Sequence, residues 1–366
     1  MPGFRIEQGD CRPLFCFEVG FAIDLAEAAR LVGSRSGAPA IEHREHPGGV
    51  GPFEFRPAPL RIREPLGNAT VPPFRLGPEV ELTLYDFGAA SVSYAIPLAP
   101  GPAELLELSM ALRGHAGLVT DARRRIGARI EALGPAIERP KLAERFEDFF
   151  LFEIRAIEGT PDATVLCHEH AELLARVLRA ETTELSEAEI ADAIEARLSF
   201  GKRDVTLVDW DAGIIVDREP DELRAVLEFA NVQLLELRYL DDELDRTLER
   251  SYQLLSRRHN WRWMWPGFQG DEWRRLSTLQ VESAVLLERV TNALKFLGEE
   301  YLARLYRMAA ERLHLGEWAA AITRKLQTLD GIHKTMSERA SARRMEVLEW
   351  VIILLIALEI VLAAVG

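Results

Sequence analysis

The sequence predicts an α+β protein. We expect an N-terminal domain with a mixed, largely antiparallel sheet, then a long antiparallel helical hairpin of coiled-coil type, and one C-terminal transmembrane helix. Strand-like and helical segments alternate over residues 1–218, whereas residues 219–345 contain few breakers and repeat apolar residues with a helical period. The last segment, 346–366, is strongly apolar. We therefore divide the chain into three parts at these positions.

Within residues 1–218, periodicity and turn residues identify the elements. Residues 80–98 have the composition of a strand pair and contain Gly88, so we expect a hairpin that turns near this glycine. Two shorter strands over 203–217 are expected to turn at Asp211, Ala212 and Gly213. Further strands are expected over 14–21, 52–64 and 146–158, and helices over 25–32, 103–114, 120–133, 163–179 and 187–198.

A heptad repeat runs through the long helix that is expected after Pro220 and Asp221, two residues that favour a first helical turn. One seam position of this repeat holds Leu223, Ala230, Leu237, Leu244 and Ser251, and the other holds Leu227, Leu234, Asp241, Leu248 and Leu255. A later stripe of the same kind consists of Leu315, Trp318, Ile322, Leu326, Leu329 and Met336. Such stripes pack within one chain or mediate self-association, and both uses stay open.

The C-terminal segment, residues 350–366, carries a single charge, Glu359. An apolar run of this length approaches what a membrane-spanning helix needs, and Arg339, Arg343 and Arg344 before it fit the positive-inside rule. We therefore expect a tail anchor in the inner (plasma) membrane of a bacterial cell, with the lipid bilayer as partner and the bulk of the chain in the cytoplasm. The anchor residues are Trp350, Ile352, Ile353, Ile356 and Glu359.

One alternative to this anchor is that the apolar helix is buried in the core of an oligomer. For Glu359 two roles are kept: it extends to the far membrane surface or is protonated, or it makes a helix–helix contact in an oligomer. The N-terminus begins with acidic residues and lacks an apolar stretch, so no secretory signal is expected there.

Composition and charge narrow the function. The 366 residues are 48% hydrophobic and 28% charged, as in an ordinary folded protein. The net charge of −14 argues against nucleic acid as a partner, because neutralising phosphates needs a basic surface. The three cysteines, Cys11, Cys16 and Cys167, have no regular spacing, which predicts no disulfide framework and a reducing compartment.

No phosphate-binding loop, glycine fingerprint or nucleophile elbow is present, so no catalytic residue and no cofactor is predicted. Cys167, His168 and His170 are weak candidates for metal ligands, together with His43 and His46. Neither cluster has the pair of histidines around a glutamate that marks metalloproteases, so ordinary surface or core histidines are the favoured explanation of both.

A tryptophan- and arginine-rich segment is expected at the tip of the helical hairpin. Such residues pack as a hairpin tip with cation–π contacts, contact a protein or membrane surface, or stack on RNA bases. The segment consists of Arg257, Arg258, Trp261, Arg262, Trp263 and Trp265.

Residues 348–359, which read LEWVIILLIALE, resemble the C-terminal signature of the "required for meiotic nuclear division" family. Tyr85-Asp86-Phe87-Gly88, followed by Val92, is similar to an aromatic-Phe-Gly strand pair of that family, although Tyr94 stands where tryptophan is more usual; residues 227–236 are similar to its helix after the sheet. The resemblance implies an integral membrane protein that often self-associates and has no established catalytic activity. Mitochondrial relatives support translation at the inner membrane.

We therefore expect a non-enzymatic, tail-anchored scaffold or tether, with an α+β domain that binds an unknown protein partner and helical arms that form a homo-oligomer. One alternative is a metal-dependent enzyme that uses Cys167, His168 and His170. Another is an RNA or ribosome tether that acts at the membrane through the segment from Trp261 to Trp265.

Overall fold

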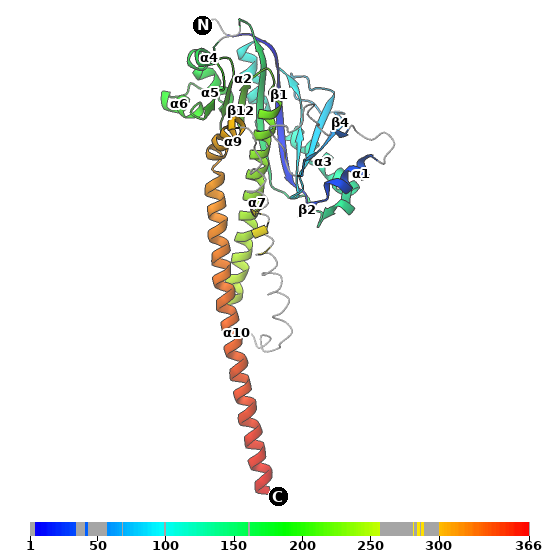
Figure 1. Cartoon of the computed structure of the whole chain (residues 1–366), viewed down its shortest axis with the longest axis vertical. Helices are drawn as coiled ribbons and strands as arrows, with labels where there is room; N and C mark the ends of the chain where they lie inside the picture. Colours follow the sequence, from blue (N-terminus) through cyan, green and yellow to red (C-terminus); the bar gives the residue numbers. More distant parts are fainter. Residues whose placement is uncertain are drawn as a thin grey trace. The chain divides into compact units, whose positions relative to one another are not determined.

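The structure of the protein is a computed structural model, and most of the chain is described in it (Figure 1). The described residues are 4–33, 41–42, 57–67, 69–98, 100–159, 162–256, 281, 284–285, 287–288 and 300–365. The chain divides into two compact units, of which the first comprises Met1–Tyr239 and Leu286–Trp318 and the second comprises Leu240–Val285 and Ala319–Gly366.

The first unit is built on a ten-stranded mixed sheet with strand order β10-β11-β12-β9-β1-β6-β5-β4-β3, in which β7 pairs with β1 beside β6. Two long strands, β1 and β9, are antiparallel to each other, and β12 is parallel to β9. The other neighbours are antiparallel, so the predicted mixed α+β class is confirmed. The strands are β1 (Ile6–Glu18), β3 (Ile41–Glu42), β4 (Leu60–Pro65), β5 (Glu79–Leu84), β6 (Ala89–Ser93), β7 (Ile96–Pro97), β9 (Phe146–Ile157), β10 (Arg197–Leu198), β11 (Val205–Val208) and β12 (Ala212–Val216).

Short helices follow or separate these strands, and β2 and β8 form a small sheet of their own. The helix expected over 163–179 is two helices, because the first ends at His170, whose φ of −119° and ψ of 20° leave the helical range. The helix expected over 187–198 stops early and is followed by β10. These elements are β2 (Ala22–Ile23), α1 (Leu25–Gly33), α2 (Pro102–Leu112), α3 (Ala116–Leu133), η1 (Gly134–Ala136), β8 (Ile137–Glu138), α4 (Ala163–Glu169), α5 (Ala171–Arg179) and α6 (Glu187–Ala193).

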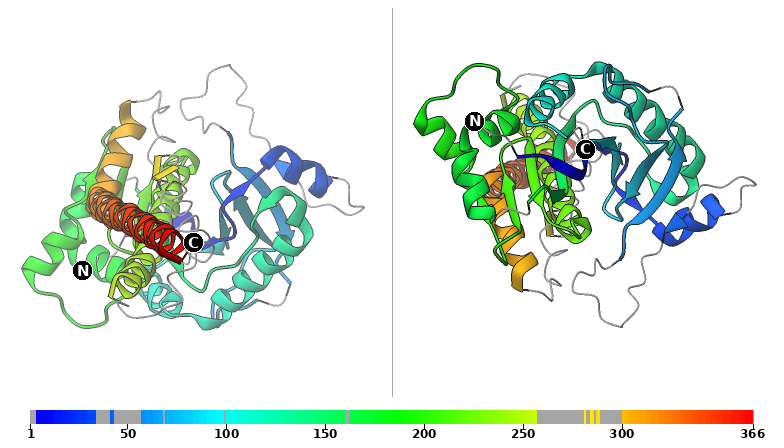
Figure 2. Two further views of the ribbon diagram at one scale, coloured as in Figure 1. Left: turned by 90° about the horizontal axis from the view of Figure 1, so that it is seen from below. Right: turned by 90° about the horizontal axis from the view of Figure 1, so that it is seen from above.

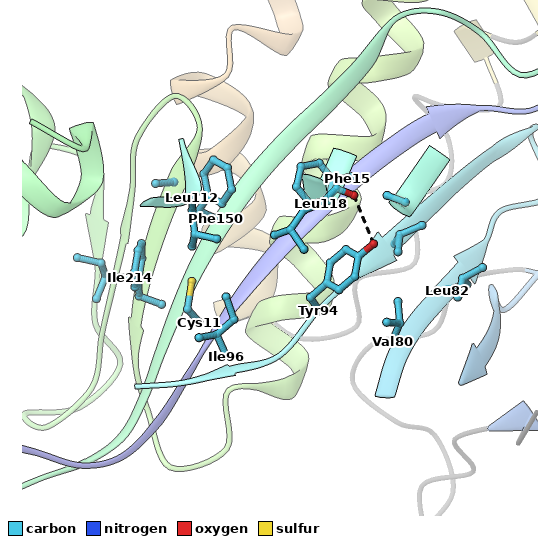
Figure 3. Packing of buried hydrophobic residues seen from close by; sticks show 14 of the residues in the cluster. Cys11, Phe15, Val80, Leu82, Tyr94, Ile96, Leu112, Leu118, Phe150 and Ile214 are labelled. Atoms are coloured by element: carbon cyan, nitrogen blue, oxygen red, sulfur yellow. Dashed lines mark hydrogen bonds between the residues drawn. The ribbon is translucent and has the colours of Figure 1, made fainter. Parts of the chain in front are cut away.

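One face of the large sheet is apolar and is covered by helices α1, α2, α3 and α5. Alternate strand residues such as Phe15, Leu82 and Phe150 pack there against Leu112 and Leu118, as Figure 3 shows. The helix α3 (teal) runs along the outside of the sheet in both views of Figure 2. Burying the rings and branched side chains of this face supplies the main stabilisation of the first unit, at about 25 cal/mol per Å² of apolar surface.

The predicted hairpin is confirmed, and Gly88 lies in its turn between β5 and β6. Gly88 has a φ of +102°, which favours glycine, and an added Cβ would lie 2.0 Å from the carbonyl oxygen of Gly20. The neighbouring Tyr85 and Phe87 rings are stacked at 5.4 Å, and both lie near Phe229. The close approach of two backbones therefore requires glycine here.

After the sheet, the long helices among the described residues are α7 (Asp221–Ser256), α9 (Glu300–Arg312) and α10 (Leu315–Val365). Leu223, Ala230, Leu237, Leu244 and Ser251 are all buried, as expected for the first seam of the heptad frame. Beyond Tyr239 the other buried positions are Leu240 and Thr247 rather than Asp241 and Leu248.

Helices α7 and α10 run parallel to each other, so the expected antiparallel pairing is wrong for these two arms. The guanidinium of Arg238 lies 5.4 Å from the ring centroid of Trp318. Further along both helices, Nζ of Lys325 lies 2.7 Å from Asp241 and 2.6 Å from Asp245. Later residues of α7 thus contact later residues of α10.

The predicted transmembrane anchor is corrected by the structure. None of the helices among the described residues combines the length with the apolar character that a membrane span requires. The apolar run, residues 350–366, has 17 residues and includes an acid, whereas a span needs about 20 apolar residues. This finding overturns the transmembrane helix, the inner-membrane location and the bilayer partner that were expected from Trp350, Ile352, Ile353, Ile356 and Glu359.

Candidate functional site: a buried charged layer between α7 and the sheet

The second face of the large sheet is polar, and the first part of α7 covers it. Because side chains alternate along a strand, the residues on this face are the neighbours of those in the apolar core. Residues of α7 that are three or four positions apart contact the side chains of this polar face. We call this set the buried charged layer; its members are Arg12, Cys16, Glu18, Arg61, Glu81, Ser91, Glu147, Glu153, Arg155, Arg224, Glu228, Asn231, Glu236 and Arg238.

Glu153 on β9 is the centre of one half of the layer. Its side chain is fully buried and lies 2.9 Å from Nη1 of Arg224, 3.0 Å from Nη2 of Arg155 and 3.8 Å from Nε of Arg12. Burial alone would lower the pKa of Arg224, but the ion pairs with Glu153 and Asp221 outweigh it and raise this pKa further above its ordinary value. Glu153 therefore joins α7 to the centre of the sheet.

Glu228 on α7 contacts the strands on the other side of β1. Its carboxylate accepts a hydrogen bond of 2.5 Å from Oγ of Ser91, and its second oxygen lies 3.6 Å from Arg61. Arg61 in turn donates to Glu81 at 2.7 Å. Burial and then the neighbouring charge of Glu228 raise the pKa of Tyr85 well above its ordinary value. The phenol of Tyr85 therefore keeps its proton at neutral pH.

Cys16 lies at the centre of the layer, where Asn231 of α7 donates a hydrogen bond of 3.4 Å to its sulfur. Burial, followed by the charge of Glu228, raises the pKa of this thiol well above its ordinary value. A nucleophilic cysteine needs a lowered pKa and access for a substrate, and Cys16 is fully buried. Its position favours packing rather than catalysis.

A pair of glutamates ends the layer. Glu18, the last residue of β1, and Glu236 of α7 are 4% and 0% exposed. Beside them, Arg238 donates to Glu147 at 2.7 Å. Burial is the largest cause that raises the pKa of both carboxyls, in the case of Glu236 to about 7. Glu18 and Glu236 thus differ from the rest of the layer, since no arginine among the described residues pairs with them.

The layer is well suited to fixing the position of α7 on the sheet. Buried ion pairs add little net stability compared with apolar packing, but a shifted register would leave a charge buried without its partner, at a cost of about 3–5 kcal/mol. Among the described residues no group of three or more histidine, cysteine, aspartate or glutamate side chains has the arrangement of a metal site. The ion pairs between α7 and the strands therefore suit the alignment of this helix on the sheet.

Of the residues predicted as metal ligands, Cys167, His168 and His170 lie outside this layer, and among the described residues they form no metal-site group. Cys167 is buried within α4, and burial raises its pKa. His168 is exposed, and His170 ends α4 with its ring 5.0 Å from that of Phe4. Outside the described residues lie His43, His46, Arg257, Arg258, Trp261, Arg262, Trp263 and Trp265.

Sequence analysis did not identify the buried charged layer. Charges that alternate with apolar residues along a strand normally mark a solvent-exposed face. The available indication was on α7, where four polar residues interrupt an apolar segment over residues 226–237: Glu228, Asn231, Gln233 and Glu236. Polar residues spaced within such a segment predict a polar surface opposite the helix.

The fold and this layer define a class: an α+β protein whose mixed sheet is covered on its polar face by a long helix. Within that class the chain belongs to the family described as "uncharacterized protein MJ0711, N-terminal domain", whose model matches residues 8–222. The uncharacterized protein MJ0711 of Methanocaldococcus jannaschii is 25% identical over 227 residues, which cover 60% of this chain and 67% of that protein. No solved structure matches the chain.

These comparisons overturn the expected membership of the "required for meiotic nuclear division" family, to which neither finding points. The matched region ends at residue 222, well before residues 348–359 that carried that resemblance. A short run of leucine and isoleucine is common to apolar helices of many origins, so it does not identify a family.

Proposed function

We propose that the chain is a non-enzymatic scaffold that self-associates through the end of α10 and presents its α+β unit to a protein partner. One observation carries the proposal. Trp350 through Ala357 are eight consecutive exposed residues of α10. Trp350 is 61% exposed and Leu354 is 67% exposed.

So many exposed apolar side chains on one helix indicate a binding surface. At about 100° per residue, eight consecutive positions cover every side of a helix. A helix that is apolar on all sides is normally buried in a core or in a membrane, and none of the described helices qualifies as a membrane span. Full burial of each large apolar side chain contributes about 1.5–3 kcal/mol. Packing against copies of the same helix supplies such a core.

The number of copies follows from the same geometry. In a two-helix contact each helix buries one stripe and leaves its far side in water. Burying more than one stripe of the segment therefore requires at least two neighbouring helices, and thus three or more copies. The heptad spacing of α10, which continues from Leu315 through Ile322 and Leu329, is of the kind that coiled coils use.

The test is the mass of the full-length chain by sedimentation equilibrium, with and without the substitution Ile353→Lys. Ile353 is 53% exposed, so the change affects only its contacts with another molecule. We expect the variant to dissociate. Thr335→Lys, at an exposed position of the same helix outside the apolar run, is the matched control and should keep the oligomer. A monomeric unsubstituted chain would contradict the proposal.

A further inference from the structure

Glu18 and Glu236 form an unusual contact within the buried charged layer. Glu18 comes from β1 and Glu236 from α7, and each is buried away from water. Their carboxyl groups lie within hydrogen-bonding reach of each other. Two ionised carboxylates have acceptors only, so this contact requires a proton on one of them.

Most of the carboxyl oxygens of the pair have no hydrogen-bond donor. Oε2 of Glu18 and both side-chain oxygens of Glu236 are buried without a hydrogen-bond partner when the two groups are written as carboxylates. A buried carboxylate without a donor is costly, and two of them side by side also repel each other. A single proton removes one charge and supplies the missing donor.

The charged groups around the pair do not replace this proton. Lys141, which follows β8, acts on Glu18 and favours its ionised form, but it is the weakest of the causes that set its pKa. On β9, Glu147 is paired with Arg238 of α7 and lies 4.0 Å from Arg145.

We propose that Glu18 and Glu236 together form a proton-binding site at neutral pH, in which the protonated carboxyl of Glu18 donates to the carboxylate of Glu236. Below neutral pH the second carboxyl also takes up a proton. Above neutral pH, Glu236 releases this second proton to water. The contact between α7 and β1 then contains one buried negative charge, which lowers its stability. The attachment of α7 to the sheet is therefore linked to pH.

The direction of the pH effect follows from the pKa of Glu236. A carboxyl whose pKa rises on folding, here from 4.5 to about 7, contributes most to stability at low pH, and that contribution is lost as pH rises through about 7. A shift of about 2.5 units corresponds to a factor of about 300 in the folding equilibrium constant. Glu236→Gln keeps the shape and removes the titration.

The experiment compares urea unfolding of the full chain and of Glu236→Gln between pH 4.5 and pH 8. We expect the ratio of their folding constants to rise about 150-fold in favour of the variant over this range, because part of the change already occurs at pH 4.5. Glu249→Gln, at an exposed position of the same helix, is the control, and its ratio should stay flat. A ratio for Glu236→Gln as flat as that of the control would overturn the proposal.

A second measurement applies even if a variant does not fold. In the native full chain, labelled at the carboxyl carbons of glutamate, NMR should detect glutamates that still titrate near neutral pH. Glu18→Gln and Glu236→Gln should each remove or shift this titration. If all glutamate carboxyls in the native chain are already ionised below neutral pH, no proton is bound by the pair.

Discussion

Replacing Arg224 by methionine tests the ion pairs that hold α7 on the sheet. Arg224 is 11% exposed at its side chain and lies 2.9 Å from the fully buried Glu153. At that separation two unit charges interact by about 5–6 kcal/mol at an effective dielectric constant of about 20. Removing one partner of a buried pair costs about 3–5 kcal/mol. Because Arg155 and Arg12 also contact Glu153, we expect the lower end of this range, about 3 kcal/mol.

The assay is urea-induced unfolding of the full chain at pH 7, with Arg5→Met as the matched control. Arg5 and Glu158 are 4.0 Å apart and their side chains are 68% and 62% exposed, so this pair is at the surface. An exposed pair contributes no more than about 1 kcal/mol. Arg224→Met should therefore destabilise the chain several times more than Arg5→Met does.

Two results would refute this reasoning. If both variants lose the same small free energy of unfolding, the layer is hydrated and its ion pairs are energetically equivalent to surface pairs. If Glu153→Gln combined with Arg224→Met loses as much as the two single changes together, the two groups are not coupled. We expect the double variant to lose clearly less than this sum, because residues in direct contact are not additive.

Two further changes test the core around the sheet. Gly88→Ala should destabilise the first unit by at least about 2 kcal/mol in thermal or urea unfolding, because Gly88 has a φ of +102° and no room for a Cβ beside Gly20; an unchanged stability would contradict the turn geometry. Cys11, Cys16 and Cys167 are buried with raised pKa values, so a thiol reagent at pH 8 should modify them in the native chain only as fast as it unfolds; rapid modification of all three would show that the core is open.

Much of the fold was predictable because local patterns determine it. The turn at Gly88 and the buried seam through Leu223, Leu237 and Leu244 follow from local sequence. The direction of the helical arms does not. The contact of Lys325 with Asp241 depends on where α9 ends and α10 begins, which is a tertiary feature. A heptad pattern does not distinguish parallel from antiparallel helices.

The candidate site was harder to predict for a similar reason. Glu18, Glu147 and Glu153 alternate with apolar residues, and this pattern is the same for a surface that meets water and for one that meets a polar helix. For Glu153 and Glu147, only the tertiary contacts with Arg224 and Arg238 make burial possible. The apolar end of α10 was misassigned because 17 residues with one acid suit a helical core as well as a short membrane segment.

The most direct test of the self-association is the mass of the unsubstituted chain in detergent-free buffer, measured by sedimentation equilibrium over a range of concentrations. The exposed apolar end of α10 predicts a species of at least three copies of the 41.2 kDa chain, which dissociates when Ile353 is replaced by lysine. A folded species of 41.2 kDa at all concentrations would contradict it.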